Sequence, residues 1–564
     1  MLTTNKTGIS RFIENAVTQG MQHVVCSPGS RNAPLVIAID NHPEIETIVV
    51  PDERSAGFVA LGMAQQLNAP VGVICTSGSA MLNYYPAVAE AYYQCIPLVV
   101  MSADRPQEWV NHGDGQTIVQ RGVYTNHIHS ELDIEEFVTT EDHASFDERI
   151  VEAFGKSSSG WKGPIHFNFP LSEPLYDIVE IQRLEVAEKF MEPSLELSAD
   201  DREKLKSAWN ASEKRMILCG QMAPDVTVLN VLADLCEDAS VVVLVENTSN
   251  LIHPKFVHCI DRTLSAISEE ELEGFQPNLL ISIGGAIISK RIKKFLRTSP
   301  IKEHLKIGFD FPEMDTYRKL TATIHSSPAN VLRAIPTISD SIHPSRFGWK
   351  WKQKDYLIQE KMPEFIQNAP YSDLTVFDIV LDSIPDNTHL HMANSSVVRY
   401  GQLFEPIRTI RYYANRGTSG IDGSTSTAVG ASLIRKNDLH VLISGDLSFF
   451  YDSNAFWNNA VGENFRVIVI NNGGGGIFRI IDGPGSTKQL ENYFETENSA
   501  SVEGICKAYH MEYLAADNLQ EVESQMEMLL TMDTKGKSAV LEIFTPNTEN
   551  DAVLKNFFKH FNSL

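Results

Sequence analysis

The chain has 564 residues and a formal net charge of −25; 43% of its residues are hydrophobic and 21% are charged. This composition is that of an ordinary folded protein and excludes a disordered or fibrous chain, while the length predicts about three or four domains. The strong negative charge disfavours binding to nucleic acid and to anionic membranes, because both would repel the protein.

The cysteines and the N-terminal residues indicate a reducing, intracellular setting. The seven cysteines form no CxxC pair and are scattered along the chain, so they predict no disulfide framework. The first ten residues, MLTTNKTGIS, lack the apolar core of a signal peptide, and no apolar run approaches the roughly 18 residues needed to span a bilayer. We therefore expect a cytoplasmic protein with no membrane partner.

From residue 10 to about 175, short apolar runs alternate with helix-like stretches, which is the pattern of a parallel sheet with crossover helices. The runs end in the polar or glycine-rich turns SPGSRNAP, PDERSAG, TSGSA and SADRP. Because the carboxyl ends of parallel strands form the ligand crevice of an open α/β sheet, these four turns should converge on one site. The predicted strands are His23–Cys26, Ile45–Val50, Val71–Cys75 and Leu98–Met101.

Two further α/β units are predicted. Residues from about 182 to 212 are mostly charged or polar and should form a connector and a surface helix, and the stretch from Pro328 to Pro344 should be irregular. The predicted fold class is therefore α/β, with three doubly wound parallel-sheet domains at residues 1–185, 186–345 and 346–564. The predicted strands are Met216–Cys219, Val241–Val245, Leu279–Ile283 and Leu305–Phe309 in the second unit, and Thr388–Met392, Thr409–Tyr413, His440–Ser444, Arg466–Ile470 and Ala539–Ile543 in the third.

The strongest pattern in the third unit joins two polar turns. Gly445 and Asp446 follow the apolar run HVLIS, and Asn471 and Asn472 follow the run RVIVI, one strand-helix-strand crossover later. A carboxylate, a carboxamide oxygen and a free main-chain carbonyl form the oxygen site that Mg²⁺ prefers. The glycines that follow, at 473–476, would let main-chain N–H groups approach a diphosphate.

This pattern resembles the signature of thiamine-diphosphate enzymes, which carry a pyrimidine-binding, a central and a diphosphate-binding domain in that order. The resemblance extends over nearly the whole chain. The sequence is similar to one family in particular, the 2-succinyl-5-enolpyruvyl-6-hydroxy-3-cyclohexene-1-carboxylate synthases of menaquinone biosynthesis. The motifs that carry it occur in order as PGSRNAPL, DERSAG, TSGSA, SADRP, GQTIVQ, SKR, NSSVVR, NRGTSGIDG, GDLSFFYDSNA and NNGGGGIF.

The resemblance implies which residues bind the cofactor. It places Glu53 against the aminopyrimidine ring of thiamine diphosphate and Ile421 between the two rings of the bent cofactor. It implies Asp446, Asn472 and the main-chain carbonyl of Gly474 as ligands of Mg²⁺ or Mn²⁺. Further cofactor contacts are implied for Ser395, Gly420, Leu447, Ser448, Gly475, Ile477 and Phe478.

The implied reaction decarboxylates 2-oxoglutarate and adds the remaining succinyl unit to isochorismate. Both substrates are dicarboxylates, and arginine is preferred where a planar carboxylate is bound through two N–H groups. Arg31 and Gln116 are implied to act in catalysis beside Glu53. The implied substrate-binding residues are Ser30, Arg31, Arg105, Gln116, Lys290, Arg291, Arg399, Arg416, Phe478 and Ile481.

In the family the two halves of the cofactor are bound by different chains, so the resemblance implies a homo-oligomer, a dimer or a tetramer, with active sites between subunits. Two positions depart from the family pattern. Gly115 stands where asparagine usually precedes the glutamine, and Gly473 stands where asparagine or aspartate is common. The implied metal ligand after Asn472 is a main-chain carbonyl, so the second departure leaves the metal site intact.

Other interpretations are weaker. Taken by itself, Glu53 would be a turn carboxylate paired with Arg54. Another thiamine-diphosphate decarboxylase or carboligase would not need so many arginines, and a non-catalytic thiamine-fold binding protein could lack Glu53 or Asp446, which are both present. A nicotinamide dehydrogenase would carry GxGxxG after a first strand, and none of the strand-end turns supplies it.

Overall fold

The computed structural model describes residues 1–192, 196–340, 343–480, 483, 486–496 and 499–562. The chain divides into two compact units. The first unit comprises residues 1–193, 415–440 and 451–465, and the second comprises residues 194–414, 441–450 and 466–564. Each unit is described by itself.

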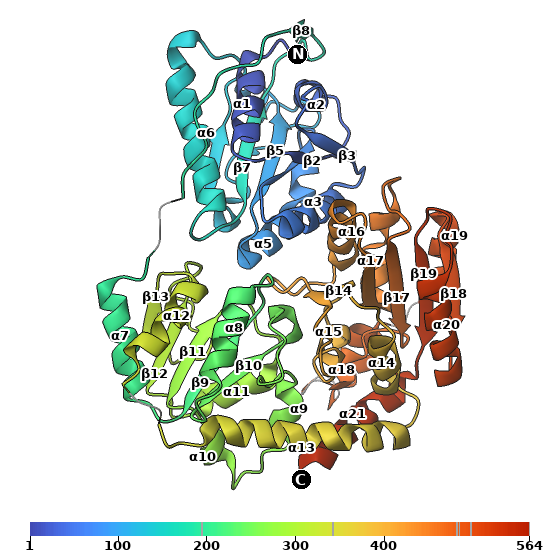
Figure 1. The fold of residues 1–564 in the computed structure, drawn as a ribbon. Coiled ribbons are helices and arrows are strands. Elements are labelled where there is room, and N and C mark those ends of the chain that lie inside the picture. The colour runs from blue at the N-terminus through green and yellow to red at the C-terminus, as the bar shows by residue number, and fades with distance from the viewer. Residues whose placement is uncertain (193–195, 341–342, 481–482, 484–485, 497–498, 563–564) are drawn as a thin grey trace. The chain divides into compact units, whose positions relative to one another are not determined.

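The first unit is built on a six-stranded parallel sheet of order β3-β2-β4-β5-β7-β6 (Figure 1). Helices α1, α2 and α6 pack together over the buried core of this sheet, while α3 packs on β4 and α5. A short antiparallel pair joins β1 to β8. The strands are β1 (Leu2–Thr4), β2 (His23–Cys26), β3 (Glu46–Val49), β4 (Val71–Cys75), β5 (Leu98–Asp104), β6 (Ser130–Asp133), β7 (Ile165–Pro170) and β8 (Ile178–Glu180), and the helices are α1 (Thr7–Thr18), α2 (Ala33–Asp40), α3 (Glu53–Leu67), α4 (Ala80–Asn83), α5 (Tyr85–Gln94), α6 (His143–Ser158) and α16 (Ser424–Ile434).

The second unit contains a five-stranded parallel sheet of order β10-β9-β11-β12-β13. Strands β9 and β10 are buried at every position, which explains why they read as continuous apolar runs. A hydrophobic core lies on each face of the sheet. The elements are β9 (Arg215–Cys219), β10 (Val241–Val245), β11 (Leu279–Ile283), β12 (Glu303–Ile307), β13 (Ala322–Ile324), α7 (Ala199–Asn210), α8 (Val226–Leu235), α9 (Ile260–Ser265), α10 (Leu272–Phe275), α11 (Lys290–Thr298), α12 (Pro328–Ile338) and α13 (Phe347–Asn368).

A third sheet, of order β15-β14-β16-β17-β19-β18, has six strands, and β14 with β15, β17 with β19, and β18 with β19 pair in parallel. Strands β16 and β17 are neighbours in this sheet, as the spacing of the two polar turns predicts. The elements are β14 (His389–Met392), β15 (Arg411–Tyr413), β16 (His440–Gly445), β17 (Phe465–Asn471), β18 (Glu512–Ala516), β19 (Ala539–Phe544), α14 (Asp373–Asp382), α15 (Ser396–Tyr400), α17 (Asp446–Tyr451), α18 (Ile477–Ile480), α19 (Val502–Ala508), α20 (Leu519–Thr531) and α21 (Asn547–Asn562).

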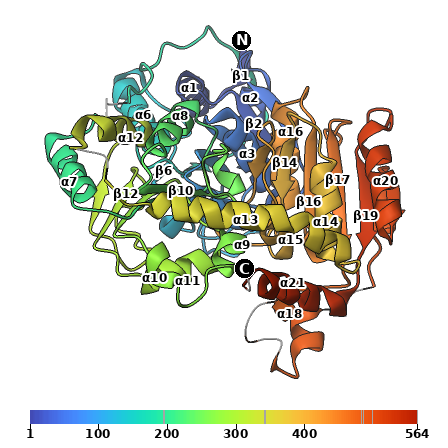
Figure 2. The same cartoon turned by 60° about the horizontal axis from the view of Figure 1, so that its bottom comes forward.

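The long helix α13 connects these two sheets within the second unit (Figures 1 and 2). It packs on β10 and α9 at one end and reaches α14 at the other. Trp351 is fully buried, meets the rings of Phe275 and Phe295 edge-on, and donates its indole N–H to the carbonyl of Phe275 at 3.1 Å. This anchor satisfies the one polar atom of a large apolar side chain, as a buried tryptophan requires.

The three parallel sheets with flanking helices confirm the predicted fold class. The predicted strands are found, four with the predicted bounds and the others with shifts of up to three residues at their ends, whereas β1, β6, β7, β8, β13 and β18 are not among the predicted strands. The expectation of an irregular stretch from Pro328 to Pro344 is wrong, because α12 occupies Pro328–Ile338. Pro328 stands at the first helical position, where its missing N–H costs no hydrogen bond, and Pro336 lies near the helix end. Among the described residues, no helix is both long and apolar enough to cross a membrane.

Helices α3 and α16 of the first unit cross at two glycines. A Cβ atom at Gly62 would lie 2.0 Å from the carbonyl oxygen of Thr427, and one at Gly430 would lie 2.0 Å from that of Val59. The two backbones therefore touch without intervening side chains. This close approach fixes the segment 415–440 against the helix that begins at Glu53.

We expect Gly62→Ala to lower the free energy of unfolding by about 1–3 kcal/mol, because the new methyl group would push the two helices apart. Chemical denaturation followed by circular dichroism measures the change. Gly274→Ala is the matched control, since it adds the same atom to helix α10 where only the end of Lys350 lies nearby, at 3.4 Å. Equal stability of Gly62→Ala and the wild type would contradict the close packing of α3 on α16.

Candidate functional site

Glu53 is the first residue of α3. Asp52 caps the helix, and its carboxylate accepts a hydrogen bond from the main-chain N–H of Arg54 at 3.0 Å. Burial raises the pKa of the Glu53 carboxyl, a main-chain hydrogen bond opposes this shift, and the Asp52 charge adds to it. The Arg54 guanidinium turns to other partners, donating to the carbonyl of Tyr451 at 2.7 Å and lying 3.9 Å from Asp452. Glu53 is therefore a partly desolvated carboxyl rather than half of an ion pair with its neighbour.

The strand-end turns of the first sheet meet, as the parallel topology predicts. A Cβ atom at Gly29 would lie 2.3 Å from Thr76, so the SPGSR turn lies against the TSGSA turn. Arg31 is 5% exposed, donates to the carbonyl of Leu171 at 3.0 Å and lies 3.2 Å from Glu173. Burial lowers the pKa of Arg31.

Arg31 and Arg105 both stand in turns at this edge of the sheet. After burial, the charge of Arg105 is the next largest cause that lowers the pKa of Arg31, while Glu173 and Asp114 oppose the shift. Arg105 donates to the carbonyl of Gly115 at 3.4 Å, and its buried Nε has no hydrogen-bond partner. Two guanidinium groups whose charges repel favour the binding of an anion, so these turns are suited to binding a carboxylate. Ser30, in the same turn as Arg31, is exposed.

Gln116 is exposed and has a left-handed backbone, with φ of 55°. A Cβ atom added at Gly78 would lie 3.0 Å from the Cα of Gln116, so Gln116 lies directly over the TSGSA turn. A Cβ atom at Gly115 would meet no atom within 4 Å. Packing therefore does not require glycine at position 115, where the family pattern has asparagine.

The NRGTSGIDG loop belongs to the first unit and is held by a glutamate that the sequence did not single out. The buried carboxylate of Glu90 accepts hydrogen bonds from the N–H of Gly417 at 2.7 Å and of Thr418 at 2.6 Å. Arg416, at the start of this loop, is 8% exposed. Gly420 and Ile421 are partly buried, and two residues further on a Cβ atom at Gly423 would collide with the ring of Phe58 on α3. The loop that carries Ile421 thus packs on the same helix that begins at Glu53.

In the second unit, Asp446 and Asn472 follow the neighbouring strands β16 and β17. Asp446 is 2% exposed, and its Oδ1 accepts the N–H of Leu447 at 2.8 Å, whereas its buried Oδ2 has no hydrogen-bond partner. Burial raises the pKa of Asp446 to about 7, although main-chain hydrogen bonds from Leu447 and Gly474 lower it in part. A buried carboxylate oxygen without a partner is costly unless a cation binds it.

Asn472 is positioned by Asp373, which the sequence analysis missed. The Asn472 amide nitrogen donates to Asp373 at 3.1 Å, which fixes the orientation of the carboxamide and hence of its oxygen. Gly473 and Gly474 have φ values of 78° and 143°, and a Cβ atom at Gly474 would lie 2.4 Å from the carbonyl of Glu495. Only glycine suits position 474, whereas the backbone at 473 also admits asparagine or aspartate, so Gly473 in place of these residues is compatible with the turn.

These residues fit a divalent cation of the magnesium type. The donors are hard oxygens from one carboxylate, one carboxamide and one main-chain carbonyl, and the orphaned Oδ2 of Asp446 supplies the negative charge. Within the described ranges no group of three or more histidines, cysteines or acidic side chains could hold a metal ion, so a soft or purely acidic site is not formed there.

The other predicted cofactor residues surround this turn or begin helices near it. Ser448 is buried on α17, and the ring of Phe478 would lie 3.0 Å from a Cβ atom at Gly475. Ile477, the first residue of α18, is 8% exposed. Ser395 precedes α15 with φ of 74° and ψ of −128°, a conformation that is strained for a residue with a side chain and is found mainly at functional sites. Ile481 lies outside the described residues.

Burial raises the pKa of Asp261, and two motifs far apart in the sequence oppose this shift. Arg291 of the SKR turn and Arg399 of NSSVVR both act electrostatically on its carboxyl. Lys290 and Arg291 are exposed in the first turn of α11, and Arg399 is partly buried, with burial lowering its pKa. The sequence predicted each arginine separately but gave no signal for Asp261. By contrast Glu246, which binds the same turn, directly follows the apolar run Val241–Val245, so the strand-end pattern could have revealed it.

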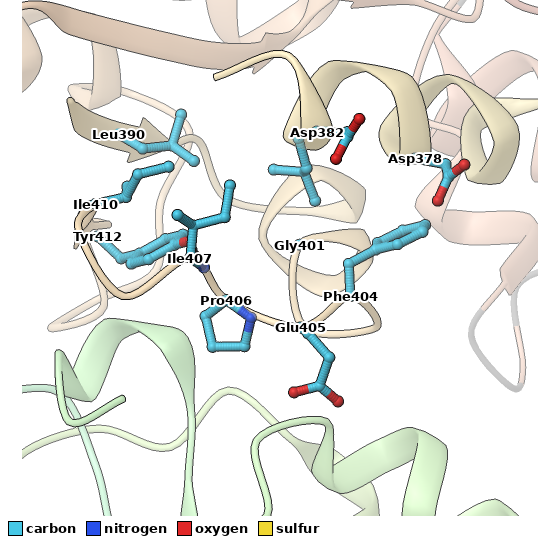
Figure 3. A pocket seen from close by; sticks show the side chains of 11 residues that line it. Asp378, Asp382, Leu390, Gly401, Phe404, Glu405, Pro406, Ile407, Ile410 and Tyr412 are labelled. Carbon is cyan, nitrogen blue, oxygen red and sulfur yellow. Dashed lines mark hydrogen bonds between the residues drawn. The ribbon is translucent and has the colours of Figure 1, made fainter. Parts of the chain in front are cut away.

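A separate cavity of about 190 Å³ lies elsewhere in the second unit (Figure 3). The carboxylates of Asp378 and Asp382 on α14 lie on one side of it, and Ile407, Ile410 and Tyr412 lie on the other. It includes none of the predicted site residues. We therefore place the functional chemistry at the strand-end turns rather than in this cavity.

Comparison with known proteins supports the chemistry of these turns. The family model of the thiamine pyrophosphate enzyme N-terminal TPP binding domain matches residues 6–136, and that of the C-terminal TPP binding domain matches residues 395–543. The first match contains Glu53, Arg31 and Arg105, and the second contains Asp446 and Asn472. The chain is thus a thiamine-diphosphate-dependent enzyme.

Relatives of known name narrow the class to one family. The chain is 41% identical to 2-succinyl-5-enolpyruvyl-6-hydroxy-3-cyclohexene-1-carboxylate synthase of Flavobacterium psychrophilum, over 97% of this chain and 98% of the relative. It is 38% identical to the synthase of Porphyromonas gingivalis, over 99% and 97% of the two chains, and 35% identical to that of Desulfotalea psychrophila, over 97% and 99%. The chain belongs to this synthase family of menaquinone biosynthesis.

We expect Asp446→Asn to weaken the binding of thiamine diphosphate in the presence of Mg²⁺ by about 10- to 100-fold, because the cation would lose its charged protein ligand. Isothermal titration calorimetry measures the affinity. Asp378→Asn is the matched control in the same unit, since Asp378 is also a carboxyl whose pKa burial raises but lines the separate cavity. Unchanged affinity in Asp446→Asn would contradict the assigned metal site.

Proposed function

We propose that this protein decarboxylates 2-oxoglutarate and adds the resulting succinyl unit in conjugate fashion to isochorismate, giving 2-succinyl-5-enolpyruvyl-6-hydroxy-3-cyclohexene-1-carboxylate. The observation that carries the proposal is the set of arginines in the strand-end turns and at the start of α11, Arg31 and Arg105 in the first unit and Arg291 and Arg399 in the second, in a chain of net charge −25. Two dicarboxylate substrates need such local positive charge. The names of the relatives support the same reaction.

The roles of Glu53 and Ile421 follow from their positions. When bound, thiamine diphosphate supplies the electron sink that takes up the negative charge left by the loss of CO₂. The Glu53 carboxyl would hydrogen-bond a ring nitrogen of the aminopyrimidine and hold a proton there, a task for which a carboxyl of raised pKa is suited. Ile421 would press against the cofactor and, with Gly420, hold it bent.

We propose that Asp446 Oδ2, the carboxamide oxygen of Asn472 and the carbonyl of Gly474 bind Mg²⁺ or Mn²⁺, which in turn holds the diphosphate. The support is the orphaned Oδ2 and the orientation of Asn472 by Asp373. Around them, the diphosphate and thiazolium ring would be contacted by Ser395, Leu447, Ser448, Gly475, Ile477 and Phe478.

Substrate carboxylates are proposed to bind the arginines. Ser30 and Gln116 would add neutral hydrogen bonds beside Arg31, and Phe478 and Ile481 would form an apolar wall. Arg31 and Gln116 would also orient the reacting groups during catalysis. The remaining cations proposed to contact substrate are Lys290 and Arg416.

The proposed assembly is a homo-oligomer with active sites between subunits. Glu53 and Asp446, which would bind opposite ends of one cofactor, belong to different compact units of the chain. We propose domain boundaries at residues 1–185, 186–345 and 346–564, each around one of the three sheets. A cytoplasmic location is proposed because the seven cysteines are scattered along the chain without a CxxC pair.

The reaction is tested by following the ultraviolet absorbance of isochorismate with purified protein, thiamine diphosphate, Mg²⁺ and 2-oxoglutarate. We expect isochorismate to disappear only when every component is present. Persistence of isochorismate while 2-oxoglutarate is decarboxylated would show a different acceptor. The absence of both reactions would contradict the proposed function.

We expect Glu53→Gln to retain thiamine diphosphate binding but to lower kcat by about 10²- to 10⁴-fold, because the amide cannot exchange a proton with the cofactor. Steady-state kinetics and calorimetry measure the two effects. Glu46→Gln is the control, since Glu46 is an exposed carboxylate on β3 that pairs with Lys436 at 2.9 Å. Turnover of Glu53→Gln equal to the wild type would refute the assigned role.

A further inference from the structure

The GQTIVQ motif contains two glutamines, and the second of them, Gln120, takes no part in the proposed reaction. Gln116 is exposed, whereas Gln120 is 1% exposed. A buried amide needs hydrogen-bond partners within the protein, because an unsatisfied polar group is costly away from water. The partners of Gln120 therefore show what this side chain holds in place.

One end of the Gln120 amide binds the TSGSA turn. Its Oε1 accepts a hydrogen bond from the main-chain N–H of Gly78 at 2.8 Å. Gly78 has a left-handed backbone with φ of 85°, and a Cβ atom there would lie 3.0 Å from the Cα of Gln116. Gln120 thus fixes the main chain on which Gln116 rests.

The other end of the Gln120 amide binds the ends of two buried strands. Its Nε2 donates to the carbonyl of Ala103 on β5 at 3.1 Å and to the side-chain oxygen of Asn168 on β7 at 2.9 Å. It also donates to the hydroxyl of Ser102 at 3.3 Å. Ser102 and Asn168 are both buried, so the amide joins the loop to rigid parts of the sheet.

A second connection returns to the same loop two residues later. The Ser102 hydroxyl lies 2.7 Å from Nε2 of His166, whose Nδ1 lies 3.0 Å from the Glu131 carboxylate. Glu131 accepts the main-chain N–H of Gly122 at 2.9 Å. A serine, a histidine and an acid in this order resemble a hydrolase triad, but Ser102 and His166 are fully buried, so no substrate reaches the hydroxyl. These contacts instead hold residues 120–122 on the sheet.

We propose that Gln120 is a positioning residue, which holds Gln116 at the carboxyl edge of the first sheet. Its amide binds the turn beneath Gln116 with one end and the strands with the other. Because Gln116 is exposed, its position depends on the main chain beneath it. This inference rests on the proposed function, because it takes Gln116 as a group that contacts the substrate.

A purely structural role would predict something different. Tyr124, in the same segment, is also fully buried and donates its hydroxyl to the carbonyl of Met81. If Gln120 only fastened the segment to the sheet, the loss of either side-chain hydrogen bond would have the same consequence. If Gln120 positions Gln116, only the loss of the Gln120 amide would change turnover.

The kinetic test compares Gln120→Met, Gln116→Ala, the double variant and Tyr124→Phe in the holoenzyme with 2-oxoglutarate and isochorismate. Methionine keeps the approximate length of glutamine but removes the amide. We expect Gln120→Met to lower kcat/KM about tenfold with an unchanged affinity for thiamine diphosphate. The double variant should be no slower than Gln116→Ala, because the two residues act as one unit. Tyr124→Phe should lower the melting temperature without any change in kcat/KM.

Hydrogen exchange followed by mass spectrometry gives a readout that does not depend on activity. The N–H of Gly78 is buried and bonded to Gln120. The peptide that contains the TSGSA turn should therefore exchange faster in Gln120→Met than in the wild type. Equal exchange of this peptide in the two proteins would overturn the link from Gln120 to the turn.

The outcomes separate the two proposals. A wild-type kcat/KM in Gln116→Ala would remove the role of Gln116 and the positioning role with it. A slow Gln116→Ala beside a wild-type Gln120→Met would overturn the positioning role alone, and so would multiplied effects in the double variant. Equal losses of kcat/KM in Gln120→Met and Tyr124→Phe would reduce Gln120 to a fastening of the segment.

Two further results remain decisive. If Gln120→Met does not fold, Gln120→Asn should show the same fall in kcat/KM, because its amide is one methylene shorter and cannot reach the turn and the strands together. Wild-type kinetics in that variant would overturn the proposal. If the wild type consumes no isochorismate, the proposed function fails, while hydrogen exchange still tests whether Gln120 holds the TSGSA turn.

Discussion

The parallel pairing of strands is the constraint on which the rest of this structure depends. In a parallel sheet every strand ends at the same edge, so the residue that follows each strand meets the residues that follow its neighbours. In the first unit this brings the turn that contains Gly29 against Thr76, and in the second it brings Asp446 and Asn472 to neighbouring strand ends. Strands buried on both faces must be apolar throughout, so polar chemistry is confined to these edges.

The burial of charged groups then determines which of them can bind a cation or the cofactor. Asp446 keeps one carboxylate oxygen buried without a partner, and Glu53 has a raised pKa while its neighbour Arg54 turns elsewhere. Both are energetically unfavourable until a cation or a cofactor nitrogen binds. By contrast, the partly buried Glu405 accepts a hydrogen bond from Arg262; although burial opposes the shift, His258 and Arg262 lower the pKa of Glu405 to about 2.

Holding the site requires residues that never touch a ligand. Glu90 binds the loop before Ile421, Asp373 orients Asn472, and Glu246 with Asp261 fixes the turn that carries Arg291. All four are acidic. Part of the strong negative charge of the chain therefore holds main-chain N–H groups and cationic side chains in place. The arginines are thereby kept at the candidate site, while the rest of the surface stays acidic.

The sequence by itself determined the fold class, the strands with continuous apolar runs and the turns that carry Glu53, Asp446 and the arginines. It could do so because strand periodicity and turn residues are local properties, and because the motifs occur in one order along the chain. It missed β1, β6, β7, β8, β13 and β18, and it took α12 for an irregular stretch because prolines usually interrupt helices, whereas Pro328 stands at the first helical position and Pro336 lies in the last turn. Only the tertiary structure decided that Asp261 binds the hydroxyl of Ser289, that Asp373 orients Asn472, and that α3 touches α16 at Gly62 and Gly430. These contacts join residues tens to hundreds of positions apart, and the distance between two such residues is set by how helices pack on sheets, which no local pattern encodes.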